Sequence, residues 1–309
     1  MNRNFADPLS IDKNRLAELS HRTNGPGLRR LLVQSAAYLA SAAAMMTASE
    51  RGVVALWLVV NGVVQFGMFG MLHESCHQTP FRSRGLNLLA GWVAALAHPM
   101  SPALMRAFHF EHHRHTHDLA RDPELAGLPF MVNWPRHVVW IGTMTGLPIL
   151  LARVGWTVFA AFVPASGLWD RVLPFVKPAR RRRIAWEARA LCVVHAAIIG
   201  AAFAWYRPLL LLYAGMWIGH ALTAIYTTCE HRGLAEGGTI LERTRSLVAP
   251  GWLRWLLWNM PYHAEHHGWP AVPFHRLGAR HDEVGPQLVH RESVVYLHLH
   301  GGRERAEPR

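Results

Sequence analysis

Three short histidine-rich segments carry the residue types best suited to chemistry in this chain of 309 residues. They read HESCH at residues 73–77, HFEHH at residues 109–113 and HAEHH at residues 263–267. Residues three or four positions apart share one face of a helix, so each segment can direct two or three imidazoles toward one point. The eight histidines are His73, His77, His109, His112, His113, His263, His266 and His267.

These segments predict a site for two metal ions. Imidazole nitrogen is a ligand for iron, zinc, copper and nickel. Eight imidazoles exceed the four ligands of a tetrahedral zinc site, so a pair of metals is expected. One HxxxH pair arises readily by chance among 21 histidines, whereas three spaced segments together do not. The alternative is a solvated histidine-rich loop that binds metal adventitiously, but such tracts are usually continuous runs.

Carboxylate and amide side chains near the histidines are candidates to orient them. A metal-bound histidine usually donates its second ring N–H to a carboxylate or a carbonyl oxygen, which determines its tautomer. We expect some of six residues to accept such hydrogen bonds, and the alternative for each is a solvated side chain. The six are Glu74, Glu111, Glu265, Asp122, Glu230 and Asn259.

Four long apolar stretches predict the helices that hold these segments. Residues 31–49, 52–72, 190–206 and 208–228 contain no Asp, Glu, Lys or Arg. A helix needs about 20 apolar residues to cross a hydrocarbon core about 30 Å thick. Because very short connections join the members of each pair, the stretches predict two helical hairpins in a membrane.

Two further apolar stretches do not fit a simple crossing. Residues 85–105 are interrupted by prolines, and residues 137–165 contain Gly146 and Pro148, where a helix is expected to break. A single crossing by the second stretch would carry the arginine-rich residues 166–189 to the outer face, against the positive-inside rule. We therefore expect both stretches to be re-entrant or interfacial.

The predicted fold is all-α. It is an integral membrane protein with four transmembrane helices in two hairpins and a cytoplasmic helical cap that carries the dimetal site. We expect a cytoplasmic N-terminal lead-in over residues 1–30, a membrane domain over residues 31–280 and a cytoplasmic C-terminal tail over residues 281–309. In this topology, all three histidine segments lie on the cytoplasmic side.

The composition agrees with a membrane protein. Hydrophobic residues make up 51% of the chain and charged residues 17%, whereas ordinary soluble domains have roughly 25% charged residues. This apolar content excludes intrinsic disorder, and three cysteines exclude a disulfide scaffold. The formal net charge of +12 comes without basic repeats or zinc-finger spacing, so we expect no nucleic-acid partner and attribute the arginines to membrane topology.

The segments HESCH, HFEHHRHTHDLARDPE and NMPYHAEHHGWPAVPFHRL resemble the membrane fatty acid desaturase family, integral membrane diiron proteins with three histidine boxes. The resemblance covers roughly residues 50–280. The EHRG and TRS elements at residues 230–233 and 244–246 are most similar to the bacterial branch that includes the rhizobitoxine-type desaturases. The resemblance implies two iron ions, O₂ as co-substrate, a lipid or fatty acyl substrate, and a multi-pass position in a cell inner membrane.

The resemblance also implies a ninth iron ligand. In stearoyl-type members of the family, a histidine after the last span binds iron, and His231 occupies the matching place before the third box. In those members an asparagine four residues earlier contacts an iron-bound water, whereas this chain has Thr227 there. The HxxxH spacing of the first box is also shorter than in the stearoyl enzymes.

These features predict an O₂-dependent oxidoreductase that removes two hydrogens from neighbouring carbons of an acyl chain. Each turnover needs two electrons, and the chain has no GxGxxG fingerprint, no cysteine set for an iron–sulfur cluster and no haem motif. We therefore expect an external electron donor, a ferredoxin or cytochrome-type protein with its reductase.

Other activities fit the same residues. A hydroxylase or ketolase of a lipid, carotenoid or alkane would use the same histidine boxes, because both reactions begin with hydrogen abstraction. A zinc-dependent membrane hydrolase and a non-catalytic metal carrier are further alternatives. The mass of the product distinguishes a hydroxylase or ketolase from a desaturase. Metal analysis distinguishes a zinc hydrolase from a diiron enzyme.

Overall fold

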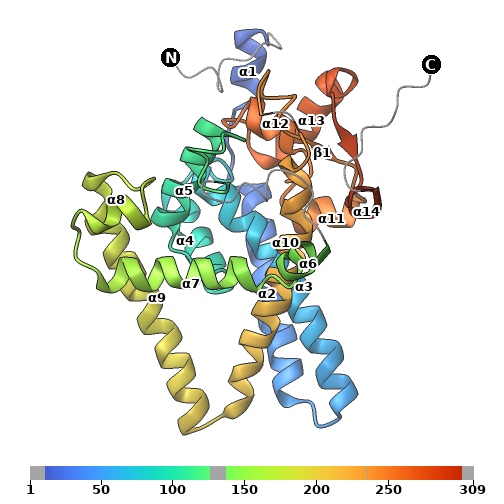
Figure 1. The fold of residues 1–309 in the computed structure, drawn as a ribbon. Helices are drawn as coiled ribbons and strands as arrows, with labels where there is room; N and C mark the ends of the chain where they lie inside the picture. The colour runs from blue at the N-terminus through green and yellow to red at the C-terminus, as the bar shows by residue number, and fades with distance from the viewer. Residues whose placement is uncertain (1–10, 126–136, 235, 301–309) are drawn as a thin grey trace.

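The computed structural model describes residues 11–125, 137–234 and 236–300 (Figure 1). Regular structure in these ranges is helical apart from two short strands, Ser246–Leu247 (β1) and Arg291–Glu292 (β2), which pair in parallel. The prediction of an essentially all-helical chain is therefore confirmed.

Two pairs of long helices extend from the body toward the same end of the molecule (Figure 1). The first pair is α2 (Gly25–Thr47) and α3 (Arg51–His77). The second pair is α9 (Pro178–Ala204) and α10 (Leu211–His231), which are joined through the 3₁₀ helix η3 (Arg207–Leu210). The pairs correspond in sequence to the four apolar stretches.

Three helical segments are long and apolar enough to cross a membrane: Arg51–His77, Pro178–Ala204 and Arg207–His231. They overlap three of the four predicted spans. The other predicted span, residues 31–49, overlaps α2, which has 23 residues and is not among the three. The three apolar segments are thus established, and a crossing by α2 stays a prediction.

Helices α3 and α10 cross in close contact through glycines. A Cβ atom added to Gly62 on α3 would lie 2.5 Å from the side chain of Ile218, and one added to Gly219 on α10 would lie 3.2 Å from the carbonyl oxygen of Gly62. Small residues allow two helix backbones to approach in this way. The crossing holds the last turns of α3 and α10 near each other, and both last turns carry histidines.

The predicted break in residues 137–165 is present. Helix α6 (His137–Met144) and helix α7 (Leu147–Phe162) are separated at Gly146, which has φ +72°. A Cβ atom there would lie 2.2 Å from the backbone nitrogen of Ala221, so glycine is needed both for the backbone conformation and for the contact with α10. In Figure 1, α7 lies across the body ends of α9 and α10.

Residues 85–105 form most of α4 (Arg84–Ala95) and the beginning of α5 (Pro102–His115), with a non-helical connection between them. The Oγ of Ser101 accepts a hydrogen bond from the backbone N–H of Leu104 at 3.3 Å, which caps the start of α5. Proline in the first turn needs no hydrogen-bond partner for its nitrogen. The second histidine box begins two turns later on this helix.

The remaining elements are short helices. They are α1 (Lys13–Leu19), α8 (Leu168–Val172), α11 (Gly251–Leu256), α12 (His263–Gly268), α13 (Phe274–Val284), η4 (Gly285–Gln287) and α14 (Val294–His300).

The predicted boundary between residues 280 and 281 falls inside α13. In α14, the Nε2 of His298 donates to the carbonyl oxygen of Ile225 on α10 at 2.8 Å. Hydrogen bonds and apolar contacts thus hold α14 against α10, and the division of the chain at residue 280 stays a prediction.

Candidate metal centre

Four helices present the nine predicted ligand histidines. The first box occupies the last turn of α3, the second box lies on α5, and the third box forms most of the short helix α12. His231 is the last residue of α10. Histidines at i, i+3 and i+4 project from one side of a helix. The imidazoles of all four helices therefore point into the same region of the protein.

The nine imidazoles form two groups, and in each group the candidate ligand atoms all lie within 4.8 Å of one another. Every member is buried. The first group contains His73, His77, His109, His113 and His266. The second group contains His112, His231, His263 and His267. The groups are adjacent, since the rings of His113 and His267 stack with centroids 4.0 Å apart.

Nitrogen-to-nitrogen distances within the groups match metal coordination. In the first group, the Nε2 of His113 lies 2.9 Å from that of His109 and 3.1 Å from that of His266. The Nε2 of His266 in turn lies 3.1 Å from that of His77. At a metal–nitrogen distance of about 2.1 Å, two ligands at right angles lie about 3 Å apart.

A web of imidazole hydrogen bonds does not explain this arrangement. An imidazole nitrogen carries either one proton or one lone pair, so the Nε2 of His266 cannot satisfy two neighbouring nitrogens equally. The buried Nε2 atoms of His73 and His267 have no hydrogen-bond partner among the described residues. Such orphaned lone pairs in a buried site fit a metal cation, and the all-imidazole donor set suits iron, zinc, copper or nickel.

The second ring nitrogens of the second group face hydrogen-bond acceptors. The Nδ1 of His112 lies 3.0 Å from both carboxylate oxygens of Asp122, and the Nδ1 of His231 donates to the carbonyl oxygen of Arg243 at 2.9 Å. The Nδ1 of His263 lies 3.3 Å from a carboxylate oxygen of Glu230. With the proton held on Nδ1, the Nε2 atom keeps its lone pair for a metal.

In the first group, Glu74 is the acid next to the ligand nitrogens. One of its carboxylate oxygens lies 3.2 Å from the Nδ1 of His73 and 3.7 Å from the Nδ1 of His266. Glu74 therefore bridges the first box and the third box. Glu74, Asp122 and Glu230 are thus placed where an orienting carboxylate is needed.

Three predicted orienting residues lie elsewhere. Glu111 forms an ion pair with Arg114, on the face of α5 away from the ligand histidines. Glu265 hydrogen-bonds to Ser246 and pairs with His281, while Asn259 donates to the carbonyl oxygen of Phe274 at 2.8 Å. These three side chains lie near ligand histidines in sequence, but their printed partners are other residues, so proximity in sequence did not become contact in space.

Electrostatics keep most ligand candidates in the neutral form that binds metal. Burial, reinforced by neighbouring imidazoles, lowers the pKa values of His109, His113 and His263 well below the ordinary range. Burial together with His73 lowers the pKa of His266 to about 3. These four side chains thus present unprotonated nitrogens at neutral pH.

His112 behaves differently because carboxylates face it. Burial opposes its protonated form, but Asp122 and Glu124 outweigh that effect and raise the pKa of His112 to about 9. The carboxylates thus favour positive charge on this imidazole, and a cation at Nε2 would satisfy them in place of the second proton.

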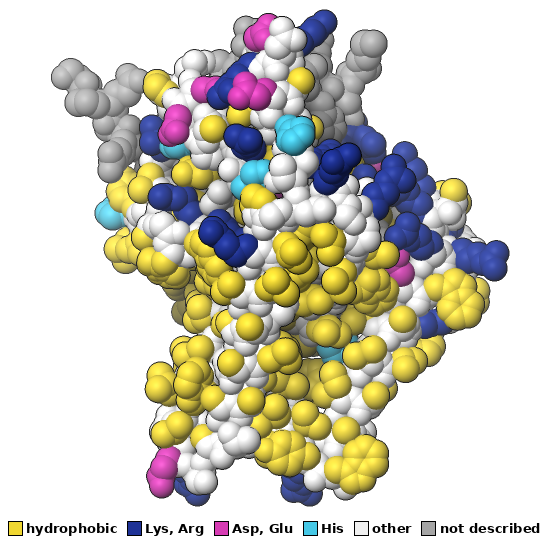
Figure 2. Space-filling model, turned by 180° about the vertical axis from the view of Figure 1, so that it is seen from behind, with side chains coloured by type: hydrophobic (Ala, Val, Ile, Leu, Met, Phe, Trp, Pro, Cys, Tyr) yellow, Lys and Arg dark blue, Asp and Glu magenta, His cyan; other side chains and the backbone are white. Residues whose placement is uncertain are grey.

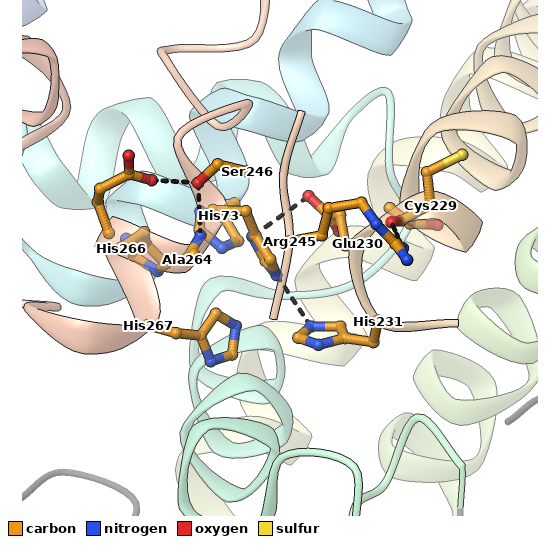
Figure 3. A network of polar contacts seen from close by, with 12 residues as sticks. His73, Cys229, Glu230, His231, Arg245, Ser246, Ala264, His266 and His267 are labelled. Atoms are coloured by element: carbon orange, nitrogen blue, oxygen red, sulfur yellow. Dashed lines mark hydrogen bonds and ion pairs between the residues drawn. The ribbon is translucent and has the colours of Figure 1, made fainter. Parts of the chain in front are cut away.

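A short segment that sequence reasoning did not assign to the site connects α10 with α12. The Nη1 of Arg245 donates to the carbonyl oxygen of Cys229 at 2.6 Å, and its backbone N–H donates to that of Glu230 at 3.0 Å. Ser246 accepts from the backbone N–H of Ala264 at 3.3 Å (Figure 3). Nothing in the spacing of these residues indicates such a role, because it depends on which elements the fold brings together.

Comparison with known proteins identifies the family of this sequence. The sequence model of the fatty acid desaturase family matches residues 51–298. The chain belongs to this family. That match includes all nine histidines of the two groups, and together with the three apolar helices it indicates an integral membrane protein related to lipid-modifying oxidoreductases.

A curated relative of this desaturase-family chain is the sphingolipid delta(4)-desaturase DES1 of Drosophila melanogaster. The two sequences are 28% identical over 241 residues, which are 72% of this chain. The matched region spans 64% of the length of the relative.

Proposed function

We propose that the protein is an O₂-dependent diiron oxidoreductase that desaturates an acyl chain of a lipid or fatty acyl substrate. The observation that carries the proposal is the pair of buried histidine groups, in which nine imidazoles from four helices gather around two adjacent centres. Membership of the fatty acid desaturase family supports the reaction type. The first group would hold one iron ion and the second group the other.

Iron bound at the two groups would supply the oxidising power for attack on an unactivated C–H bond, with O₂ as the oxidant. The overall reaction balances when one O₂, two electrons and two protons join two hydrogens taken from neighbouring carbons. The products are one carbon–carbon double bond and two waters.

The chain's own residues orient the ligands and exclude water. Asp122 and the carbonyl oxygen of Arg243 hold imidazoles of the second group with Nε2 free for a metal, and Glu230 lies 3.3 Å from the Nδ1 of His263. Glu74 does the same for the first group. Burial of every ligand candidate keeps bulk water away from the reacting centre.

We further propose the membrane topology expected from the sequence. Helices α2, α3, α9 and α10 would cross the bilayer as two hairpins, with residues 137–165 at the interface and the metal centre on the cytoplasmic side. The arginine-rich start of α9 supports this orientation by the positive-inside rule. Electrons would come from a separate ferredoxin or cytochrome-type protein with its reductase.

Expression in a bacterial host, followed by lipid mass spectrometry, tests the function. The wild-type chain is expected to produce lipids lighter by two mass units, and His266→Ala is expected to abolish them. His115→Ala is the matched control, because His115 lies on α5 beside the second box but outside both groups. A gain of sixteen mass units would assign hydroxylation instead.

Metal analysis of the purified protein tests the cofactor independently. We expect about two iron ions per chain, one for each group. About one zinc ion and no iron would overturn the diiron proposal and favour a hydrolase. Bound iron without any change in host lipids from the wild-type chain would favour a metal carrier.

A further inference from the structure

A second buried polar cluster lies outside the two histidine groups. Arg153 on α7 has 9% of its surface exposed, and His98 and His220 are completely buried. The Nη1 of Arg153 lies 2.6 Å from the Nδ1 of His98 and 3.3 Å from the Nε2 of His220. His98 comes from the α4–α5 connection and His220 from α10, so three separate parts of the chain meet here.

Both imidazoles in this cluster are neutral acceptors. The Nε2 of His98 donates to the carbonyl oxygen of Gln65 at 2.8 Å, so its Nδ1 accepts from Arg153. The Nδ1 of His220 donates to the carbonyl oxygen of Met216 at 2.8 Å, so its Nε2 accepts as well. The two histidines therefore orient the guanidinium and contribute no negative charge.

The positive charge of Arg153 has no adjacent counter-ion among the described residues. No described carboxylate lies within ion-pair distance of it, and Glu124 attracts it only at longer range. Its Nε and Nη2 atoms hydrogen-bond to none of the residues that the structure describes. An uncompensated buried charge is strongly destabilising, so this arrangement favours a site that an anion completes.

The cluster lies one aromatic ring away from the metal centre. The ring of Phe69 is 5.1 Å from the Cζ of Arg153 and 5.6 Å from the ring of His98. The same ring is 6.4 Å from the ring of His73, a member of the first group. A group bound at Arg153 would therefore be a short distance from the reacting centre.

The helix that carries Arg153 packs beside the apolar segment of α9. Helix α9 packs on α7 and η3, and its apolar segment is only 17% buried, compared with 39% for the segment that contains α10. Figure 2 shows a recess lined by hydrophobic side chains between the two legs of the molecule. Helix α7, which carries Arg153, spans the body end of this recess (Figure 1).

We propose that Arg153, oriented by His98 and His220, binds the oxyanion group of a lipid, such as its carboxylate, and positions the hydrocarbon chain at the metal centre. The inference rests on the proposed function and narrows its substrate class to lipids with an anionic oxygen group. Because Arg153 lies close to the histidine groups, its contact with the polar end of the lipid would determine which carbons of the chain lie at the metal centre.

Direct binding tests the proposal without turnover. Radiolabelled hexadecanoate and its methyl ester are titrated against the detergent-solubilised, metal-loaded chain, with inorganic phosphate as a free-anion competitor. We expect the carboxylate to bind at least tenfold more tightly than the ester, because charge-assisted hydrogen bonds are the strong ones. Arg153→Gln should remove that preference while leaving ester binding unchanged, and Arg153→Lys should restore part of it.

The matched control is Arg189→Gln. Arg189 also attaches to α7, through a hydrogen bond from its Nε to the carbonyl oxygen of Ala161 at 2.8 Å, but it lies outside the cluster. Its variant should keep the carboxylate preference. Equal loss of ester and carboxylate binding in Arg153→Gln, or an unchanged preference, would overturn the proposal.

Two further outcomes separate this inference from other failures. Displacement of hexadecanoate by millimolar phosphate would show a free-anion site and overturn the assignment to a lipid. Lipid desaturation by a wild-type chain that shows no carboxylate preference would leave the proposed function intact and refute the anchor alone.

Discussion

The two histidine groups differ in how their imidazoles are held. The first group takes its members from regular turns of α3, α5 and α12, with Glu74 as the acid beside them. The second group includes His231 at a helix end and depends on residues outside the helices, among them Asp122 and the carbonyl oxygen of Arg243. Helical spacing therefore explains the first group, and tertiary contacts between loops and helix ends explain much of the second.

The largest expected effect on iron content and activity comes from removing one histidine from either group. His113→Ala removes a member of the first group and His267→Ala a member of the second, although their rings stack on each other. Each variant should retain about one iron ion, and product formation should fall by more than about a hundredfold, since even partners of ligands can cost that much.

Iron content by elemental analysis and host lipid profiles measure this effect. His115→Ala again serves as the control. Two iron ions in either variant would show that the altered histidine is not a ligand and that the division into groups is wrong.

A smaller effect is expected when a partner of the second group is changed. Asp122→Asn removes the charge that holds the proton on the Nδ1 of His112, so we expect iron affinity to fall by about 10- to 100-fold. Chelator competition measures the affinity. Asp118→Asn is a suitable control, because Asp118 pairs with Arg121 in the same turn without contacting a ligand candidate. Equal losses in both variants would show that the turn alone matters.

The smallest effect is expected for the partner of the first group. Only one oxygen of Glu74 lies near His73, at 3.2 Å, whereas both oxygens of Asp122 lie 3.0 Å from His112, so we expect Glu74→Gln to lower iron affinity by less than about tenfold. Glu111→Gln should change it by no more than about twofold, because its ion pair with Arg114 lies away from the metal centre. A larger loss for Glu111→Gln than for Glu74→Gln would contradict the assigned contacts.

The positions of the helices could be predicted from local patterns in the sequence. The apolar stretches, the break at Gly146 and the helical spacing of the boxes are each visible over a few consecutive residues. His195 and His220 link helices through contacts with Tyr213 on α10 and Arg153 on α7, respectively. The boundary at residue 280 stays a prediction, and local patterns did not indicate the contact that holds α14 against α10, because it joins residues far apart in the chain.

The sequence by itself determined which residue types were available as ligands and which helices could carry them, because periodicity and apolar length are local properties. It could not decide that Glu74, Asp122 and Glu230 face the imidazoles while Glu111 and Glu265 do not. Only the packing of α3, α5, α10 and α12 decided this, since the direction of a short carboxylate depends on its helix's rotation against distant neighbours. Tertiary packing likewise placed Arg153 of α7 beside Phe69 of α3, a contact that no spacing in the chain indicates.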